Sequence, residues 1–156
     1  MALGLNRNKR YRQGYYYPKN AGKFIGKKAI YRSGLELQYF KFLDENPNCV
    51  KWNSEGITVP YFWQGDNKWH TYYIDLAATF KDKKGELVTY LIEIKPYRQT
   101  VVPQQTPRKR KKTLISEQVT YSQNQAKWSA AKEFAEKNKL KFIILTEKDI
   151  NEKEDL

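Results

Sequence analysis

Apolar residues recur at helical spacing in two parts of the chain and alternate with polar residues in four others. The helical stripes predict one helix over residues 33–46 and a helical region over residues 116–139. Ser33 and Glu36 form a capping box at the start of the first helix, and the run 46–48 (Asn-Pro-Asn) ends it. The alternating stretches predict strands over residues 57–63, 69–80, 87–95 and 140–145.

The connections between these elements predict how the strands pair. Turn-forming residues at 64–67 and 81–86 separate the first three strands, which we therefore expect to be antiparallel neighbours. The last strand follows a helix, so it is expected to return beside the third strand in parallel. Thr146 is expected to cap a short acidic helix. The sequence thus predicts an α/β fold in which helices flank a mixed central sheet.

The first part of the chain differs in composition from the rest. Residues 1–29 are basic, contain no acidic residue and carry three consecutive tyrosines at 15–17. This composition predicts a basic N-terminal arm, with residues 30–156 forming the folded domain. Interleaved tyrosines and basic residues suit contact with phosphates and bases. Packing of the tyrosines on this domain or on another subunit is equally compatible with the sequence.

The charge balance indicates a polyanionic partner. The chain has 29 Lys and Arg against 17 Asp and Glu, a formal net charge of +12. No acid occurs before Glu36 or between Glu93 and Glu117. Such clustering favours one DNA-facing side, although a basic protein of the ribosomal type has a similar composition.

Cysteine usage and hydropathy exclude several other classes. Cys49 is the single cysteine, so the sequence predicts neither a disulfide framework nor a thiolate zinc cluster. No apolar run is long enough for a transmembrane helix, and the basic N-terminus is not followed by the apolar stretch of a secretory signal. We therefore expect no membrane partner.

Acidic residues interrupt the two central predicted strands. Asp75 lies in one strand, and Glu93 and Lys95 lie eighteen and twenty positions further on in the next. Because strand side chains alternate between faces, Glu93 and Lys95 share one face while Ile92 and Ile94 point to the other. A charged pair on a covered face is costly unless it is compensated, and a divalent metal with a phosphodiester would compensate it.

The order of elements and motifs resembles the PD-(D/E)xK nuclease superfamily in its TnsA-like branch. It is still more similar to the family of small head-completion nucleases of T-even-type tailed phages. The resemblance covers roughly residues 30–150 and implies a restriction-endonuclease-like core of order αβββαβ. Ile74 stands where these families often have a proline before the first catalytic acid. The resemblance rests on the motifs Arg32-Ser33-x-x-Glu36, Asp44-x-Asn46-Pro47, Pro60-Tyr61-Phe62, Tyr73-Ile74-Asp75, Ile92-Glu93-Ile94-Lys95-Pro96, Lys127-Trp128-x-Ala130-Ala131 and Phe142-x-Ile144-Leu145-Thr146-Glu147.

The resemblance also implies roles for individual residues. Asp75 and Glu93, with the carbonyl of Ile94, would bind Mg²⁺, or Mn²⁺ in its place, and Lys95 would orient the attacking water. Glu36 would be a further catalytic residue, although its position in the capping box offers a purely structural alternative. No small organic cofactor is implied.

The same comparison suggests which residues contact DNA. The basic run Arg108, Lys109, Arg110, Lys111 and Lys112 follows the site in sequence and is expected to contact phosphates. Lys127 is a further candidate for DNA contact, although a solvated helix face would explain it as well. His70 is expected to be a surface or structural residue, and Trp128 a core residue.

Together, these observations predict a metal-dependent DNA endonuclease of a tailed phage. The resemblance implies action in head completion after DNA packaging, with double-stranded DNA and portal, neck or head proteins as partners. It also implies location in the head–neck region of the virion, after assembly in the host cytoplasm. A TnsA-like enzyme that cuts transposon ends is one alternative. The other is a non-enzymatic neck protein that binds DNA passively.

Overall fold

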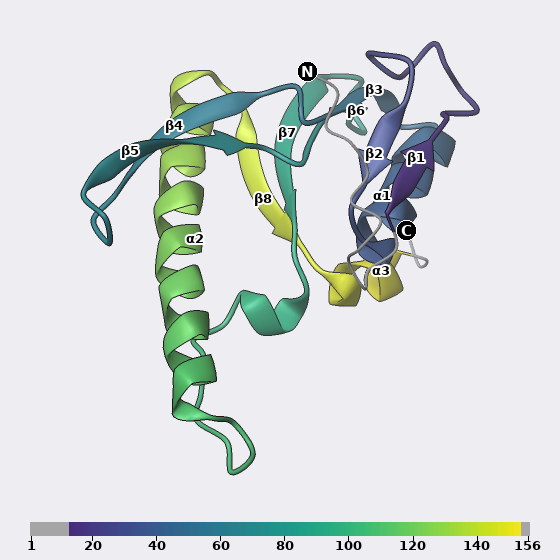
Figure 1. Cartoon of the computed structure of the whole chain (residues 1–156). Helices are drawn as coiled ribbons and strands as arrows, with labels where there is room; N and C mark the ends of the chain where they lie inside the picture. The colour runs from purple at the N-terminus through teal and green to yellow at the C-terminus, as the bar shows by residue number, and fades with distance from the viewer. Residues whose placement is uncertain (1–12, 154–156) are drawn as a thin grey trace.

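The computed structural model describes residues 13–153, which fold into helices and strands (Figure 1). The elements are β1 (Gly14–Tyr16), β2 (Ala29–Tyr31), α1 (Gly34–Glu45), β3 (Cys49–Ser54), β4 (Thr58–Trp63), β5 (Lys68–Tyr73), β6 (Leu76–Lys81), β7 (Leu87–Ile94), a short 3₁₀ turn (Tyr97–Gln99), α2 (Lys111–Lys137), β8 (Lys141–Leu145) and α3 (Glu147–Lys153).

The central sheet has the strand order β3-β6-β7-β8. Its first three strands are antiparallel, and β8 returns parallel to β7 after the long helix α2, as predicted. Taken along the chain, α1, β3, β6, β7, α2 and β8 give the order αβββαβ. The predicted α/β class, mixed sheet and element order are therefore confirmed.

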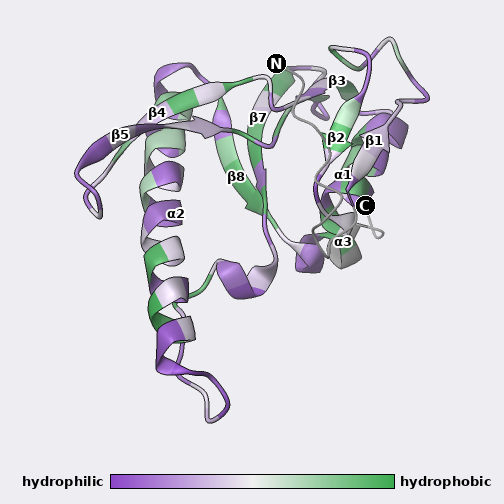
Figure 2. Ribbon diagram, in the orientation of Figure 1, coloured by the Kyte–Doolittle hydropathy of each residue, from purple (hydrophilic) through white to green (hydrophobic). Residues whose placement is uncertain are grey.

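Two apolar clusters cover the two faces of this sheet. Alternate residues of β7 point to opposite faces and so belong to different clusters. Ile92 and Ile94 belong to the cluster beside α1, whereas Leu91 belongs to the cluster beside α2. Trp128 of α2 is buried in the second cluster, as predicted. The hydropathy colouring follows this arrangement, with apolar stretches on β7 and β8 between the helices (Figure 2).

The predicted strand identities need correction. Strand β3 was missed, because its register shifts between Cys49 and Lys51 and this shift breaks the alternation of apolar residues. The predicted strand over residues 69–80 is two strands, which are separated by Ile74 and Asp75. Strands β4 and β5 form a separate two-stranded sheet, here called the β4–β5 ribbon, which is inserted between two strands of the core.

The predicted N-terminal arm is wrong for residues 13–29, which belong to the folded domain. Strands β1 and β2 pair, and the rings of Tyr16 and Phe24 are buried against Trp52 of β3. The carboxylate of Asp44, on α1, accepts hydrogen bonds from this segment, which ties it to the helix. Residues 1–12 of the predicted arm lie outside the described residues.

Helix boundaries follow the predicted caps at two of three starts. Ser33 caps α1, and Thr146 caps α3 through its hydroxyl, which accepts a hydrogen bond from the Lys148 amide at 3.2 Å. Helix α2 begins at Lys111 and not at 116. Lys111, Lys112 and Leu114 are good helix formers within this added segment, which is about 1.4 turns long. Within the described range, no helix combines the length and apolarity needed to span a membrane.

Candidate active site

Asp75 lies at the point where the chain leaves the β4–β5 ribbon and enters the central sheet. The Ile74 amide still donates to Ile57 beside the ribbon, at 3.0 Å, whereas Leu76 already pairs with Ile92 of β7. Between these two attachments, the Asp75 carboxylate accepts a hydrogen bond from the Ile94 amide at 2.8 Å. The side chain of Asp75 thus takes the place of a strand partner at the end of β7.

Glu93 and Lys95 lie on the same face at the end of β7, as predicted. The Lys95 ammonium is 3.6 Å from Glu93 Oε1, and Glu93 is buried with 4% of its surface exposed. The buried hydroxyl of Tyr72, on β5, donates a hydrogen bond to the other carboxylate oxygen, Oε2. Tyr72 therefore fixes the orientation of the Glu93 carboxylate and leaves Oε1 toward Lys95.

The structure shows the capping role of Glu36 and places its carboxylate within electrostatic reach of Glu93. Its amide donates to Ser33 Oγ at 3.1 Å, while its carboxylate accepts from the amide of Arg32 at 3.0 Å, one residue earlier than a standard capping box uses. Burial raises the pKa of Glu36, and the charges of Glu55 and Glu93 raise it further against the opposing hydrogen bond from Arg32. The Glu36 side chain therefore caps α1 and lies close enough to Glu93 for the two negative charges to interact.

The electrostatics of Asp75 reflect this crowding of carboxylates. Removal from water raises the pKa of Asp75 well above its usual range, and the negative charges of Glu93 and Glu36 raise it further. The Ile94 hydrogen bond and the Lys95 charge act in the opposite direction but do not outweigh these effects. Like charges held together in this way would be relieved by a bound cation.

Lys127 extends this site from the middle of α2. The helix begins sixteen residues before Lys127, at Lys111. Burial lowers the pKa of Lys127, as does the nearby charge of Lys95, whereas Glu93 and Asp75 oppose the shift. Its ammonium lies 5.9 Å from the centre of the Tyr72 ring. Two lysines therefore face the carboxylates from different elements.

The oxygen donors at this edge suit a hard divalent cation. Within a strand, the N–H and C=O of one residue point toward the same neighbour. Since the Ile94 amide points to Asp75, its carbonyl points to that side too, where the pairing of β6 with β7 has ended. Carboxylates and a main-chain carbonyl are ligands that Mg²⁺ accepts while retaining water. Across residues 13–153, no three His, Cys, Asp or Glu side chains stand together in positions that could hold a metal ion. The predicted metal shell differs from such a group, because it uses two carboxylates and the main-chain carbonyl of Ile94.

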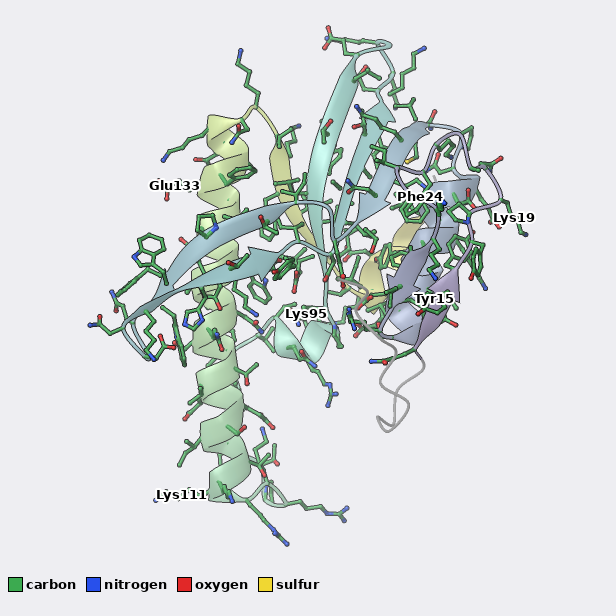
Figure 3. The ribbon with its side chains drawn as sticks, turned by 45° about the horizontal axis from the view of Figure 1, so that its top comes forward. Tyr15, Lys19, Phe24, Lys95, Lys111 and Glu133 are labelled. Carbon is green, nitrogen blue, oxygen red and sulfur yellow. The ribbon has the colours of Figure 1, made fainter. Side chains whose placement is uncertain are left out.

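The basic run 108–112 lies apart from this cluster, at the projecting end of α2. Figure 3 labels Lys95 beside the sheet and Lys111 at the far tip of the helix. Lys111 and Lys127 are 16 positions apart on α2, which is about 24 Å along the axis. Lys109 is engaged internally by Glu117, at 2.9 Å, whereas its four basic neighbours in the run are exposed.

Several residues near the site were missed from the sequence. Arg32 Nε pairs with the Glu55 carboxylate at 3.1 Å, and the Glu55 amide donates to the Asp75 carbonyl at 3.0 Å. Glu55 has a φ of 54°, an unusual conformation that the sequence does not signal. His70 pairs with Asp66 at 2.8 Å in the ribbon turn, which confirms a structural role and adds the partner that the sequence had not suggested.

Comparisons with known proteins match the same region. The family described as TnsA-like endonuclease N terminal matches residues 46–147, a range that includes Asp75, Glu93 and Lys95 and begins after Glu36. The head completion nuclease of Enterobacteria phage T4 is 40% identical over 139 residues. That alignment covers 86% of this chain and 90% of the phage T4 protein.

Proposed function

Because this chain belongs to the TnsA-like endonuclease family, we propose that it is a divalent-cation-dependent DNA endonuclease that acts in phage head completion. The observation that carries the proposal is the convergence of Asp75, Glu93 and Lys95 at one end of the central sheet. Asp75 is bonded to the Ile94 amide, and Glu93 is held between Tyr72 and Lys95. A protein that only bound DNA would gain nothing from buried carboxylates facing a polyanion.

In this proposal, Asp75, Glu93 and the carbonyl of Ile94 would hold Mg²⁺, or Mn²⁺ in its place. A bound cation of this kind polarises a phosphoryl oxygen and activates water for attack. Lys95 places positive charge beside Glu93 Oε1, where the charge of the phosphodiester grows during hydrolysis. Tyr72 keeps Glu93 in one orientation throughout.

Two further residues assist the centre. Lys127 brings a second ammonium to the same face, where the low dielectric strengthens its attraction for phosphate. Glu36 adds a third carboxylate from the start of α1, where its bond to the Arg32 amide fixes it. We assign Glu36 an accessory catalytic role in addition to its contribution to the helix cap.

The name of the phage T4 relative supports a place for the proposed enzyme in the assembly of a phage particle. Its substrate would be double-stranded DNA, and portal, neck or other head proteins would be its binding partners. The head–neck region of the virion would be its final location, after assembly in the host cytoplasm.

A plasmid-cleavage assay tests the proposed enzyme. We expect supercoiled plasmid to be cut in Mg²⁺, to remain intact in EDTA, and to be cut again when Mg²⁺ is restored in excess. Cleavage that persists at full rate in EDTA would contradict the cation requirement. Binding to the same plasmid without any cleavage, in Mg²⁺ or Mn²⁺, would instead favour a passive DNA-binding protein.

The exposed basic residues at the tip of α2 are proposed to contact phosphates. Replacing both Lys111 and Lys112 by alanine is expected to weaken duplex binding at low salt. It should also reduce the slope of log K against log salt by about 1.8, because each phosphate contact contributes about 0.9. Fluorescence anisotropy at several salt concentrations measures this slope.

A matched control for this experiment removes two lysines at the opposite end of the sheet. Lys83 and Lys84 lie in the turn between β6 and β7, away from the site, and are exposed. Their replacement by alanine changes the net charge equally and should leave the slope near its original value. Equal effects of both double variants would mean that net charge alone, and not this surface, determines binding.

A further inference from the structure

We propose that the outer face of the β4–β5 ribbon binds unpaired DNA bases by stacking, so that this protein acts on DNA carrying a single-stranded segment next to the cut. This inference rests on the proposed nuclease function and specifies its substrate. Three aromatic side chains form the face, which we call the aromatic platform: Phe62, Trp69 and Tyr73.

The aromatic platform results from the alternation of side chains along the ribbon. Trp69, Thr71 and Tyr73 alternate with inward-facing residues on β5, and Phe62 stands directly opposite Trp69 on β4. The exposed fractions are 71% for Trp69, 59% for Tyr73 and 38% for Phe62. The rings of Phe62 and Trp69 contact each other, with centroids 5.6 Å apart, and Tyr73 lies further along the same face. Exposed rings in contact indicate a binding surface, because isolated apolar residues are common but contiguous patches are not.

The other face of the ribbon makes the aromatic platform rigid. Val59, Tyr61 and Tyr72 are buried against α2, and the ribbon crosses this helix in Figure 1. The Tyr61 hydroxyl accepts a hydrogen bond from Gln123 at 2.8 Å, and the Trp63 indole donates to Ser122 at 3.3 Å. A rigid support lets a ring stack on a base without first losing conformational freedom.

The position of the aromatic platform favours DNA over a protein as its occupant. Tyr73 is two residues from Asp75, and its neighbour Tyr72 contacts Glu93 on the other face. The Tyr73 end of the platform is therefore close along the chain to the proposed site of cleavage, on the opposite face of the ribbon from the contact of Tyr72 with Glu93. The outward positions of the ribbon carry rings, threonine and proline and no Leu, Ile, Val or Met. Aromatic faces without such aliphatic neighbours suit base stacking, which tolerates any sequence.

The dimensions of the aromatic platform also suit a short strand. Trp69 and Tyr73 are four residues apart on β5, or about 13 Å in an extended strand. At about 3.4 Å per stacked base, this length corresponds to about four steps, or four to five bases.

Tryptophan fluorescence tests this inference directly. The chain has four tryptophans, of which Trp52 and Trp128 are buried and Trp69 is highly exposed. In EDTA, where no cleavage is expected, titration of the full-length protein with a 12-nucleotide oligothymidylate should quench this fluorescence. A blunt duplex of equal length should quench it much less. Trp69→Leu should abolish most of the quenching and weaken oligothymidylate binding by about tenfold or more, the effect of losing one stacked base.

Controls separate this inference from a general loss of binding and from the proposed function. Tyr17→Leu removes a ring that is similarly exposed on the N-terminal segment and should leave oligothymidylate affinity unchanged. In Mg²⁺, Trp69→Leu should slow cleavage of a duplex with a four-nucleotide single-stranded extension and spare a fully paired duplex. Normal oligonucleotide binding by Trp69→Leu would overturn the inference. If that variant bound DNA normally but failed to join DNA-filled heads, the face would instead be a protein-docking surface. In that case, cleavage of the paired duplex would still support the proposed nuclease function. A lack of cleavage of every substrate would count against the proposed function instead.

Discussion

Replacing Asp75 by asparagine is expected to reduce plasmid cleavage by about 10³-fold or more, while DNA binding remains intact or becomes tighter. The substitution removes one of two carboxylates proposed to hold the cation, and such charge stabilisation is worth several kcal/mol. Binding should survive, because the variant carries one negative charge fewer beside the phosphodiester. Supercoiled-plasmid cleavage in Mg²⁺ measures the first effect, and anisotropy in EDTA measures the second.

The same variant is expected to fold at least as stably as the original protein when no cation is present. Because the pKa of Asp75 is raised, its stabilising contribution is complete below the usual pKa of aspartic acid and is lost as pH rises through the raised value. Asparagine avoids this loss and still offers a carbonyl oxygen to the Ile94 amide. The melting temperature in EDTA at pH 7 should therefore be equal or higher.

Asp82→Asn is a suitable control for this experiment. Asp82 accepts amide hydrogen bonds in an exposed turn at the other end of β6, so its substitution should leave cleavage unchanged. Full cleavage by Asp75→Asn would remove Asp75 from the proposed site. A large fall in its melting temperature would assign Asp75 a structural role.

Replacing Asp44 by alanine is expected to destabilise the protein by about 3–5 kcal/mol, which lowers the melting temperature by about 10 °C. Asp44 is fully buried (0% exposed) and accepts hydrogen bonds from the Tyr16 hydroxyl at 2.6 Å and from the amides of Lys19 and Asn20 at 2.8 and 3.0 Å. Alanine would leave the buried Tyr16 hydroxyl and the part-buried amides of Lys19 and Asn20 without their partner. Thermal unfolding followed by circular dichroism measures the loss.

The pH dependence of this effect has a definite sign. Burial alone would raise the pKa of Asp44, but the hydrogen bonds from Tyr16, Lys19 and Asn20 outweigh it, so the pKa is lowered. The stability that Asp44 contributes is therefore present above the usual pKa of aspartic acid and lost as pH falls through the lowered value. The difference between the original protein and the variant should shrink in acid.

Asp82→Ala is the matched control here, because Asp82 also accepts two amide hydrogen bonds at 2.9 Å but in an exposed turn. Its loss should cost much less than the loss of Asp44. Equal melting temperatures for Asp44→Ala and the original protein would mean that residues 14–29 contribute little to the fold.

The candidate site could be predicted where its chemistry lies in adjacent residues of one strand. Glu93 and Lys95 share a face because strand geometry requires it, and the neighbouring isoleucines indicated a covered strand. Tyr72 and Lys127 approach the same carboxylates from a different sheet and from a helix. No local pattern shows which side chains tertiary packing brings together, so the proximity of Tyr72 and Lys127 to these carboxylates became visible only in the structure.

The order of helices and strands in the core could be predicted from the sequence, but which residues form each strand could not. The helices and the parallel return of β8 follow from caps, periodicity and connection length. The ribbon misled the prediction, because a hairpin packed on α2 has the same alternation as one in the central sheet. The segment 13–29 was misassigned because its basic composition hides the contacts of Tyr16 and Phe24 with the core.

The direct passage from β5 into β6 has a consequence for how this chain tolerates changes in length. Only Ile74 and Asp75 separate the ribbon from the sheet, and no loop can absorb an added residue there. One insertion at this junction would turn Tyr72 away from Glu93 and bring Tyr73 inward, since strand side chains alternate. We therefore expect this chain to tolerate added or removed residues at the tips 64–67 and 82–86, whereas an insertion between Tyr72 and Leu76 should disrupt the proposed site.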